Sequence, residues 1–101
     1  MTILAQADLT ASTNNLVASM VGPSTINVLL CNRTNGAVNV SMALVPTGVG
    51  APTVVHWVEY QLPLDANMSL ERTGIPLGTG DQVFVNPSGS GVSCSVIGLA
   101  I

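Results

Sequence analysis

Val38-Asn-Val-Ser-Met-Ala-Leu44 is the stretch of this sequence that decides the fold. Apolar residues occupy every second position, which is the period of a β-strand because successive side chains of a strand point to opposite faces. One face of this strand then holds Val38, Val40, Met42 and Leu44, and the other holds Asn39, Ser41 and Ala43. We therefore expect a strand that packs one face on a hydrophobic core.

The residues just before this strand indicate a turn. Asn35-Gly36 tolerates the positive φ angles that a tight hairpin requires, and the pair lies between two apolar runs. The sequence therefore predicts that the segments 25–31 and 37–45 form an antiparallel hairpin.

The period of two recurs along the chain, and no window of about twelve residues has the apolar spacing of an amphipathic helix. Turn-forming residues separate the further strand candidates. These candidates span residues 3–9, 15–21, 54–62, 68–73, 82–86 and 92–101. Eight short strands in 101 residues predict an all-β fold, a single domain over residues 1–101 built as an antiparallel β-sandwich of jelly-roll type.

Charged residues make up only 7% of the chain, against about 25% in a typical globular protein. There is no lysine, and Arg33 and Arg72 are the two basic residues, so the net charge is -3. Nucleic acids and anionic membrane surfaces bind clustered basic side chains. We therefore expect neither a nucleic-acid partner nor a membrane partner.

The first residues lack the basic start and the continuous apolar run of a signal peptide. We expect synthesis in a cytoplasm, where thiols stay reduced. Cys31 and Cys94 are the only cysteines, and no C-x-x-C spacing suggests a metal site. We expect two free thiols in the core rather than a disulfide.

Two of the expected strands are apolar on both faces. Ile26, Val28 and Leu30 oppose Leu29 and Cys31, and Cys94 and Val96 oppose Ile97, Leu99 and Ile101. A two-layered sandwich covers only one face of each sheet, so some outward residues should meet another subunit. The absence of lysine also removes a common protection of sheet edges, and we expect partners there too.

No combination of residues indicates catalysis. His56 is the only histidine, and we interpret it as a strand residue beside Trp57. Glu59 and Glu71 are a conceivable acid–base pair, but an ion pair of one of them with Arg72 or with a neighbouring subunit fits the sequence better. We therefore expect no enzyme and no catalytic residue.

Cofactor and metal sites are equally unsupported. Asp8, Asp65 and Asp81 adjoin turns and lack the spacing of a calcium-binding loop. The glycine-rich segment 74–80 lacks the lysine of a phosphate-binding loop, and we interpret it as a connection. We expect no cofactor and no metal.

Several segments together resemble the pattern of small structural proteins of tailed bacteriophages. They are Cys31-Asn-Arg33, Trp57-Val-Glu-Tyr60, Leu70-Glu-Arg-Thr-Gly-Ile75 with Leu77, and Gly80-Asp-Gln-Val-Phe-Val85. The resemblance covers most of the chain from the third expected strand onward. It implies a β-sandwich that decorates or cements a capsid, or that lies in a tail, baseplate or fibre, without catalysis. It also implies symmetric homo-oligomers, often trimers on a capsid.

The sequence therefore predicts a virion accessory protein that contacts copies of itself and the major capsid protein or tail proteins. The structural or interface residues we expect are Trp57, Glu59, Tyr60, Leu70, Glu71, Arg72, Leu99 and Ile101. The loops 47–53 and 86–91 are expected to make lattice contacts. The alternative is a tail, baseplate or fibre module that binds a receptor or glycan, with Trp57, Tyr60 and Phe84 as the only aromatic residues available.

Overall fold

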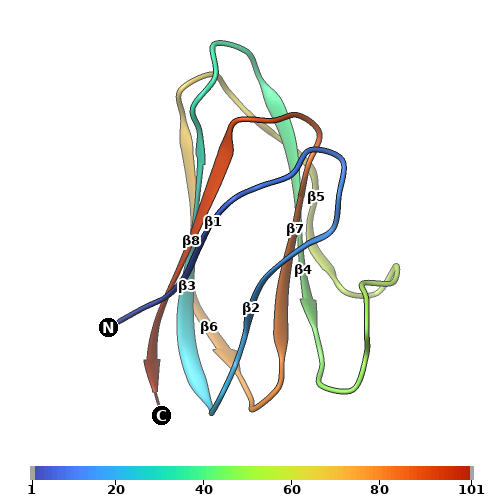
Figure 1. The fold of residues 1–101 in the computed structure, drawn as a ribbon, viewed down its shortest axis with the longest axis vertical. Coiled ribbons are helices and arrows are strands. Elements are labelled where there is room, and N and C mark those ends of the chain that lie inside the picture. Colours follow the sequence, from blue (N-terminus) through green and yellow to red (C-terminus); the bar gives the residue numbers. More distant parts are fainter. Residues whose placement is uncertain (1, 101) are drawn as a thin grey trace.

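Eight antiparallel strands form two four-stranded sheets that pack face to face (Figure 1). The computed structural model describes residues 2–100. The strands are β1 (Thr2–Asp8), β2 (Asn15–Ser19), β3 (Ser24–Asn32), β4 (Val38–Val45), β5 (Trp57–Leu64), β6 (Ser69–Leu77), β7 (Gln82–Pro87) and β8 (Val92–Ala100). No helix long and apolar enough to cross a membrane occurs in this described range.

The strand order is that of a jelly roll. One sheet has the order β1-β8-β3-β6 and the other β2-β7-β4-β5. The pairs β1·β8, β2·β7, β3·β6 and β4·β5 are those of one long antiparallel ribbon that bends back after β4 and is then wrapped around a core. The all-β sandwich predicted from the sequence is confirmed.

The core lies between the sheets and consists mainly of valine, leucine, isoleucine and methionine. The inward face of β4 is the predicted one, with Val38, Val40 and Met42 buried. Facing it are the inward side chains of β3 and β8: Ile26, Val28, Leu30, Val92, Cys94 and Val96. Burial alternates along β3, as the period of two in its sequence dictates, whereas in β4 the outward Ser41 and Ala43 are buried as well.

The predicted hairpin between β3 and β4 is wrong, because these strands belong to different sheets. The side chain of buried Asn32 organises the crossing. Its amide nitrogen donates to the carbonyls of Gly36 and Leu64, both at 2.9 Å, and its oxygen accepts from the Thr34 backbone N–H at 3.0 Å. These bonds close the loop, so Asn35-Gly36 is not needed as a hairpin turn.

Two strand boundaries differ from the sequence prediction by three residues or more, the start of β5 and the end of β6. His56 is not in a strand, because its Nδ1 accepts from the Thr53 N–H at 2.9 Å and its own N–H donates to the Thr53 carbonyl. β5 therefore starts at Trp57. In the glycine-rich segment, β6 continues to Leu77 because Gly74 adopts φ 68° and donates its N–H to Asn27 Oδ1.

The prediction of two core thiols is right for one cysteine and wrong for the other. Both are free, but Cys94 is buried and Cys31 is exposed. The two strands pair with Leu30 opposite Cys94 and Cys31 opposite Ser93. The thiols therefore lie on opposite faces of one sheet, where no disulfide can join them.

All four edge strands are interrupted by bulges. The register shifts in the β1·β8, β2·β7, β3·β6 and β4·β5 pairs, whereas the central β3·β8 and β4·β7 pairs run without a shift. Bulges are a second way to blunt an edge against strand addition. The lysine-free edges are thus protected by backbone geometry, and the flat sheet faces become the more suitable interaction surfaces.

Candidate binding surfaces

The outer face of the β2-β7-β4-β5 sheet has a small apolar cluster of its own. Ala43, Val45 and Phe84 are buried there, and Val49 and Trp57 pack against them. Val49 belongs to the connection 46–56, so this loop covers part of the sheet from outside. Trp57 is held in place by these contacts, although it is one of the residues facing solvent at the rim.

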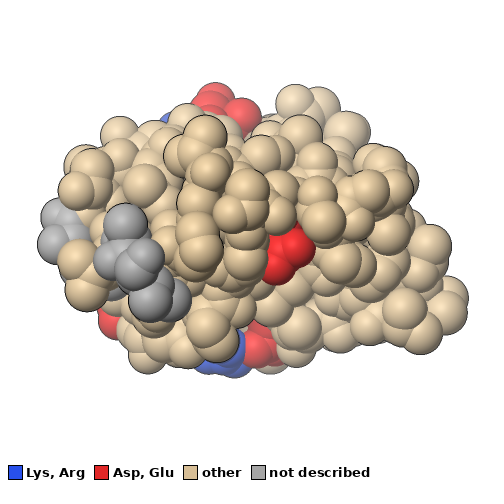
Figure 2. Space-filling model, turned by 90° about the horizontal axis from the view of Figure 1, so that it is seen from below, with Lys and Arg blue, Asp and Glu red and all other residues tan. Residues whose placement is uncertain are grey.

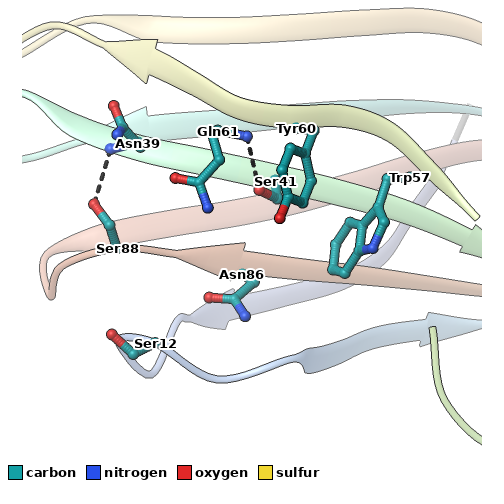
Figure 3. Close-up of a pocket in the computed structure, with 8 residues that line it drawn as sticks. All are labelled: Ser12, Asn39, Ser41, Trp57, Tyr60, Gln61, Asn86 and Ser88. Carbon is teal, nitrogen blue, oxygen red and sulfur yellow. Dashed lines mark hydrogen bonds between the residues drawn. The ribbon is translucent and has the colours of Figure 1, made fainter. Parts of the chain in front are cut away.

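A pocket of about 330 Å³ opens beside this cluster on the same face. Eight residues line it: Ser12, Asn39, Ser41, Trp57, Tyr60, Gln61, Asn86 and Ser88. Figure 3 shows Trp57, Tyr60 and Gln61 projecting from β5 toward Asn86 on β7. The volume lies at the lower end of the range of about 300–1,000 Å³ typical of small-molecule sites.

Two bulges in β5 determine which side chains reach this pocket. The β4·β5 register pairs Ala43 with Trp57, Met42 with Glu59 and Val40 with Leu62, so β5 has two extra residues. Regular alternation from Trp57 would place Glu59 outside and Tyr60 inside. The bulges reverse this arrangement, so Tyr60 is 67% exposed on the outer face and Glu59 turns away from the pocket.

The second bulge is fixed by a buried hydroxyl. Gln61 adopts φ 53°, which is rare for a residue with a side chain. Its N–H donates to the Oγ of Ser41 at 2.9 Å, and Ser41 is only 5% exposed. This bond satisfies an N–H that the bulge removes from the ladder and presents the Gln61 side chain to the pocket.

The opposite wall of the pocket comes from the turn between β1 and β2. Ser12 adopts φ 54° and donates its N–H to the Pro87 carbonyl at 2.7 Å. The neighbouring Asn14 accepts a bond of 2.9 Å from Asn86. These contacts hold the turn against the end of β7, next to the pocket.

The predicted ion pair is confirmed and involves Glu59, which bonds the guanidinium of Arg72. Glu59 lies on β5 and Arg72 on β6, the edge strands of the two sheets. The side chain of Glu59 is only 18% exposed. The pair therefore ties the two sheets together along one side of the sandwich.

The outer face of the β1-β8-β3-β6 sheet has uncovered apolar residues. Ile97 lies opposite Ile3 on β1 and one diagonal position from Leu29 on β3, and Leu99 follows two residues along β8. Ile3 is 59% and Leu99 57% exposed. We call Ile3, Leu29, Ile97 and Leu99 the apolar strip.

The other expected interface residues have different locations. Glu71 is exposed on this outer face opposite Leu29, whereas Leu70 points inward and packs against the core. Ile101 lies outside the described residues. Sequence reasoning named Trp57 and Tyr60 but missed Asn39, Gln61, Asn86 and the three serines, because only the fold brings these residues to one pocket.

Charged side chains are few and mostly engaged. Arg33 pairs with Asp8, and Asp81 accepts the backbone N–H groups of Thr47 and Gly78 in a turn. Within residues 2–100 no three His, Cys, Asp or Glu side chains come together as a metal-binding group. Figure 2 views the sandwich from the end that is lowest in Figure 1 and shows charged residues only as a few small spots, with blue and red touching at its lower edge.

Comparisons with known proteins add no identification. No protein-family model matches the chain, and neither the curated proteins nor the solved structures gave a match.

Proposed function

We propose that this chain is a virion accessory protein of a tailed bacteriophage that decorates or cements the capsid through protein–protein contacts. The observation that supports the proposal most is the apolar strip, which leaves Ile3 and Leu99 more than half exposed on a sheet face. The jelly-roll topology, which recurs in viral capsid domains, fits the same role.

The strip is suited to packing against another copy of the chain or a coat subunit. Its neighbours on β3 and β8 include Ser93, Ser95, Thr25 and Asn27, which are uncharged, whereas Glu71 on β6, opposite Leu29, is a charged residue at its border. At about 25 cal/mol per Å², covering about 400 Å² of apolar surface contributes on the order of 10 kcal/mol before the cost of association. This is enough to favour assembly.

Mass spectrometry of purified particles of the phage that encodes the chain tests the proposal. We expect hundreds of copies per particle, and we expect particles without the chain to lose heat resistance that the wild-type chain restores. Leu99→Asp should restore little of it, because a carboxylate in the strip opposes desolvation. Absence of the chain from the particles would contradict the proposal.

A handful of copies per particle would instead place the chain in a tail, baseplate or fibre. The pocket beside Trp57 and Tyr60 favours this second location, because an aromatic and uncharged pocket suits a receptor. This second location predicts that particles without the chain keep their heat resistance but fail to adsorb to the host.

A further inference from the structure

We propose that the pocket on the outer face of the β2-β7-β4-β5 sheet binds a neutral oligosaccharide. The pocket lies on the face opposite to the apolar strip, so this proposal does not depend on the assembly role. Its support comes from four properties of the lining: the aromatic pair, the unengaged amides, the lack of charge and the fixed backbone.

The aromatic pair offers a surface for the C–H face of a sugar ring. The ring centroids of Trp57 and Tyr60 are 5.9 Å apart and their planes meet at 61°. Tyr60 is 67% exposed, although burial of an aromatic ring is strongly favourable. The two rings therefore form an open corner into which one pyranose face can pack.

The amides provide the hydrogen bonds that sugar hydroxyl groups need. Within residues 2–100, the side-chain amides of Asn39 and Gln61 have no hydrogen bond to the protein, and Asn86 uses only its nitrogen. A side-chain amide both donates and accepts, which matches a hydroxyl group that does the same. Ser12 and Ser88 add hydroxyls at the rim.

The lack of charge selects a neutral ligand. None of the eight lining residues is ionisable at neutral pH, and Glu59, the nearest charged residue along β5, is engaged by Arg72. Phosphate and carboxylate groups are recognised by arginine or lysine. A sialylated or phosphorylated sugar therefore gains nothing here over a neutral one.

The backbone fixes the lining in advance. Three described residues other than glycine have positive φ, and two of them, Ser12 and Gln61, line this pocket. Strained residues persist where the surroundings hold them, and they concentrate at ligand sites. A backbone that is held in place loses less entropy on binding, which favours a weakly binding ligand such as a sugar.

The ligand is longer than one sugar ring. Trp57 and Tyr60 also line a second hollow of about 390 Å³ with Val54, so the aromatic pair stands between two depressions. A chain of two or three sugars lying across the pair would occupy both. An extended peptide is less suitable, because the bulge at Gln61 interrupts the edge strand to which a peptide would add.

Trp57 makes the test direct, because it is the only tryptophan of the chain and lies in the pocket. We would titrate the full chain with neutral trisaccharides of glucose, galactose and N-acetylglucosamine, following Trp57 emission and NMR saturation transfer. Sialyllactose and a tripeptide serve as the anionic and peptide probes. We expect at least one neutral trisaccharide to bind more tightly than either.

Matched variants locate the site. Tyr60→Ala should weaken binding by about tenfold or more, whereas Tyr60→Phe keeps the ring and should stay within about threefold. Asn39→Asp should also weaken binding, because a carboxylate accepts but cannot donate. Val58→Ala, at an exposed position of the same strand outside the pocket, should bind like the wild type.

Circular dichroism and urea unfolding establish that each variant is folded, which is expected because Tyr60 and Asn39 are exposed. The proposal is overturned if none of the neutral trisaccharides binds, if sialyllactose or the peptide binds more tightly, or if Tyr60→Ala binds like Tyr60→Phe.

Discussion

The two outer faces of this sandwich start from the same alternation of residues and end with different surfaces. On the β1-β8-β3-β6 sheet the outward side chains stay uncovered, and Ile3 and Leu99 are more than half exposed. On the β2-β7-β4-β5 sheet the connection 46–56 folds back, buries Phe84 and leaves a polar pocket beside it. The connection 46–56 covers part of the β2-β7-β4-β5 sheet, whereas no long loop within residues 2–100 covers the other sheet. One outer face is therefore flat and the other has a pocket.

The largest difference between the two faces is expected when one large side chain on each face is truncated to alanine. Phe84→Ala should lower the free energy of unfolding by about 3–5 kcal/mol, because it empties the cluster under the loop. Leu99→Ala should change it by no more than about 0.5 kcal/mol at a concentration where the chain is a single copy. Urea unfolding measures both. Equal costs would mean that the two faces do not differ in this way.

The two cysteines allow the inner and the outer face of one sheet to be compared through the pH dependence of the free energy of unfolding. Burial raises the pKa of the Cys94 thiol from 9.0 to about 12. Below pH 9 the thiol is neutral in both the folded and the unfolded chain, so its ionisation does not lower the free energy of unfolding. As pH rises from 9 toward 12 the unfolded chain loses this proton first, so the free energy of unfolding should fall by about 1.4 kcal/mol per pH unit.

Cys94→Val should lack this part of the pH dependence, and Cys31→Val should keep it because Cys31 is exposed on the outer face. Urea unfolding at several pH values separates the two variants. A wild-type slope that survives in Cys94→Val would show that another group causes it.

The two ion pairs differ in how they connect the sheets. Arg72→Leu leaves partly buried Glu59 without its partner and should cost about 1–3 kcal/mol. Arg33→Leu removes a pair whose Asp8 side chain is 75% exposed, and it should cost less than about 1 kcal/mol. Thermal unfolding of both variants checks the order. A larger loss for Arg33→Leu would contradict the bridging role of Arg72.

A modest effect on stability is expected at the bulge that shapes the pocket. Ser41→Ala removes the acceptor of the Gln61 N–H and should cost about 1 kcal/mol. The same change should weaken saccharide binding, because the backbone of Gln61 is then no longer held in place. Ser88→Ala is the control for stability, because it removes a hydroxyl that accepts from the backbone N–H of Asn39 at the exposed rim. Unaltered binding in Ser41→Ala would mean that the bulge does not position Gln61.

Strand positions were predictable because both signals are local. The period of two marks a strand, and turn residues mark its ends, so all eight strands overlap the predicted segments. Pairing was not predictable in the same way. Asn35-Gly36 suggested a hairpin, but the bonds of Asn32 to the carbonyls of Leu64 and Gly36 depend on residues that meet only in the folded chain.

The pocket was hidden for a related reason. Trp57 and Leu62 face opposite sides, as five residues of regular strand would also place them. Each bulge shifts the alternation by one residue, so the two bulges together restore it and periodicity does not reveal them. Only the register shows that Tyr60 and Gln61 share the outer face and that Glu59 turns inward to Arg72.

The claim that the two faces have different partners is tested most directly by sedimentation velocity over about a hundredfold range of concentration. Leu99→Asp and Asn39→Asp each add one negative charge, on opposite outer faces. The wild type and Asn39→Asp should sediment faster as concentration rises, whereas Leu99→Asp should remain a single copy. A wild type that stays a single copy throughout, or an Asn39→Asp variant that dissociates like Leu99→Asp, would contradict the claim.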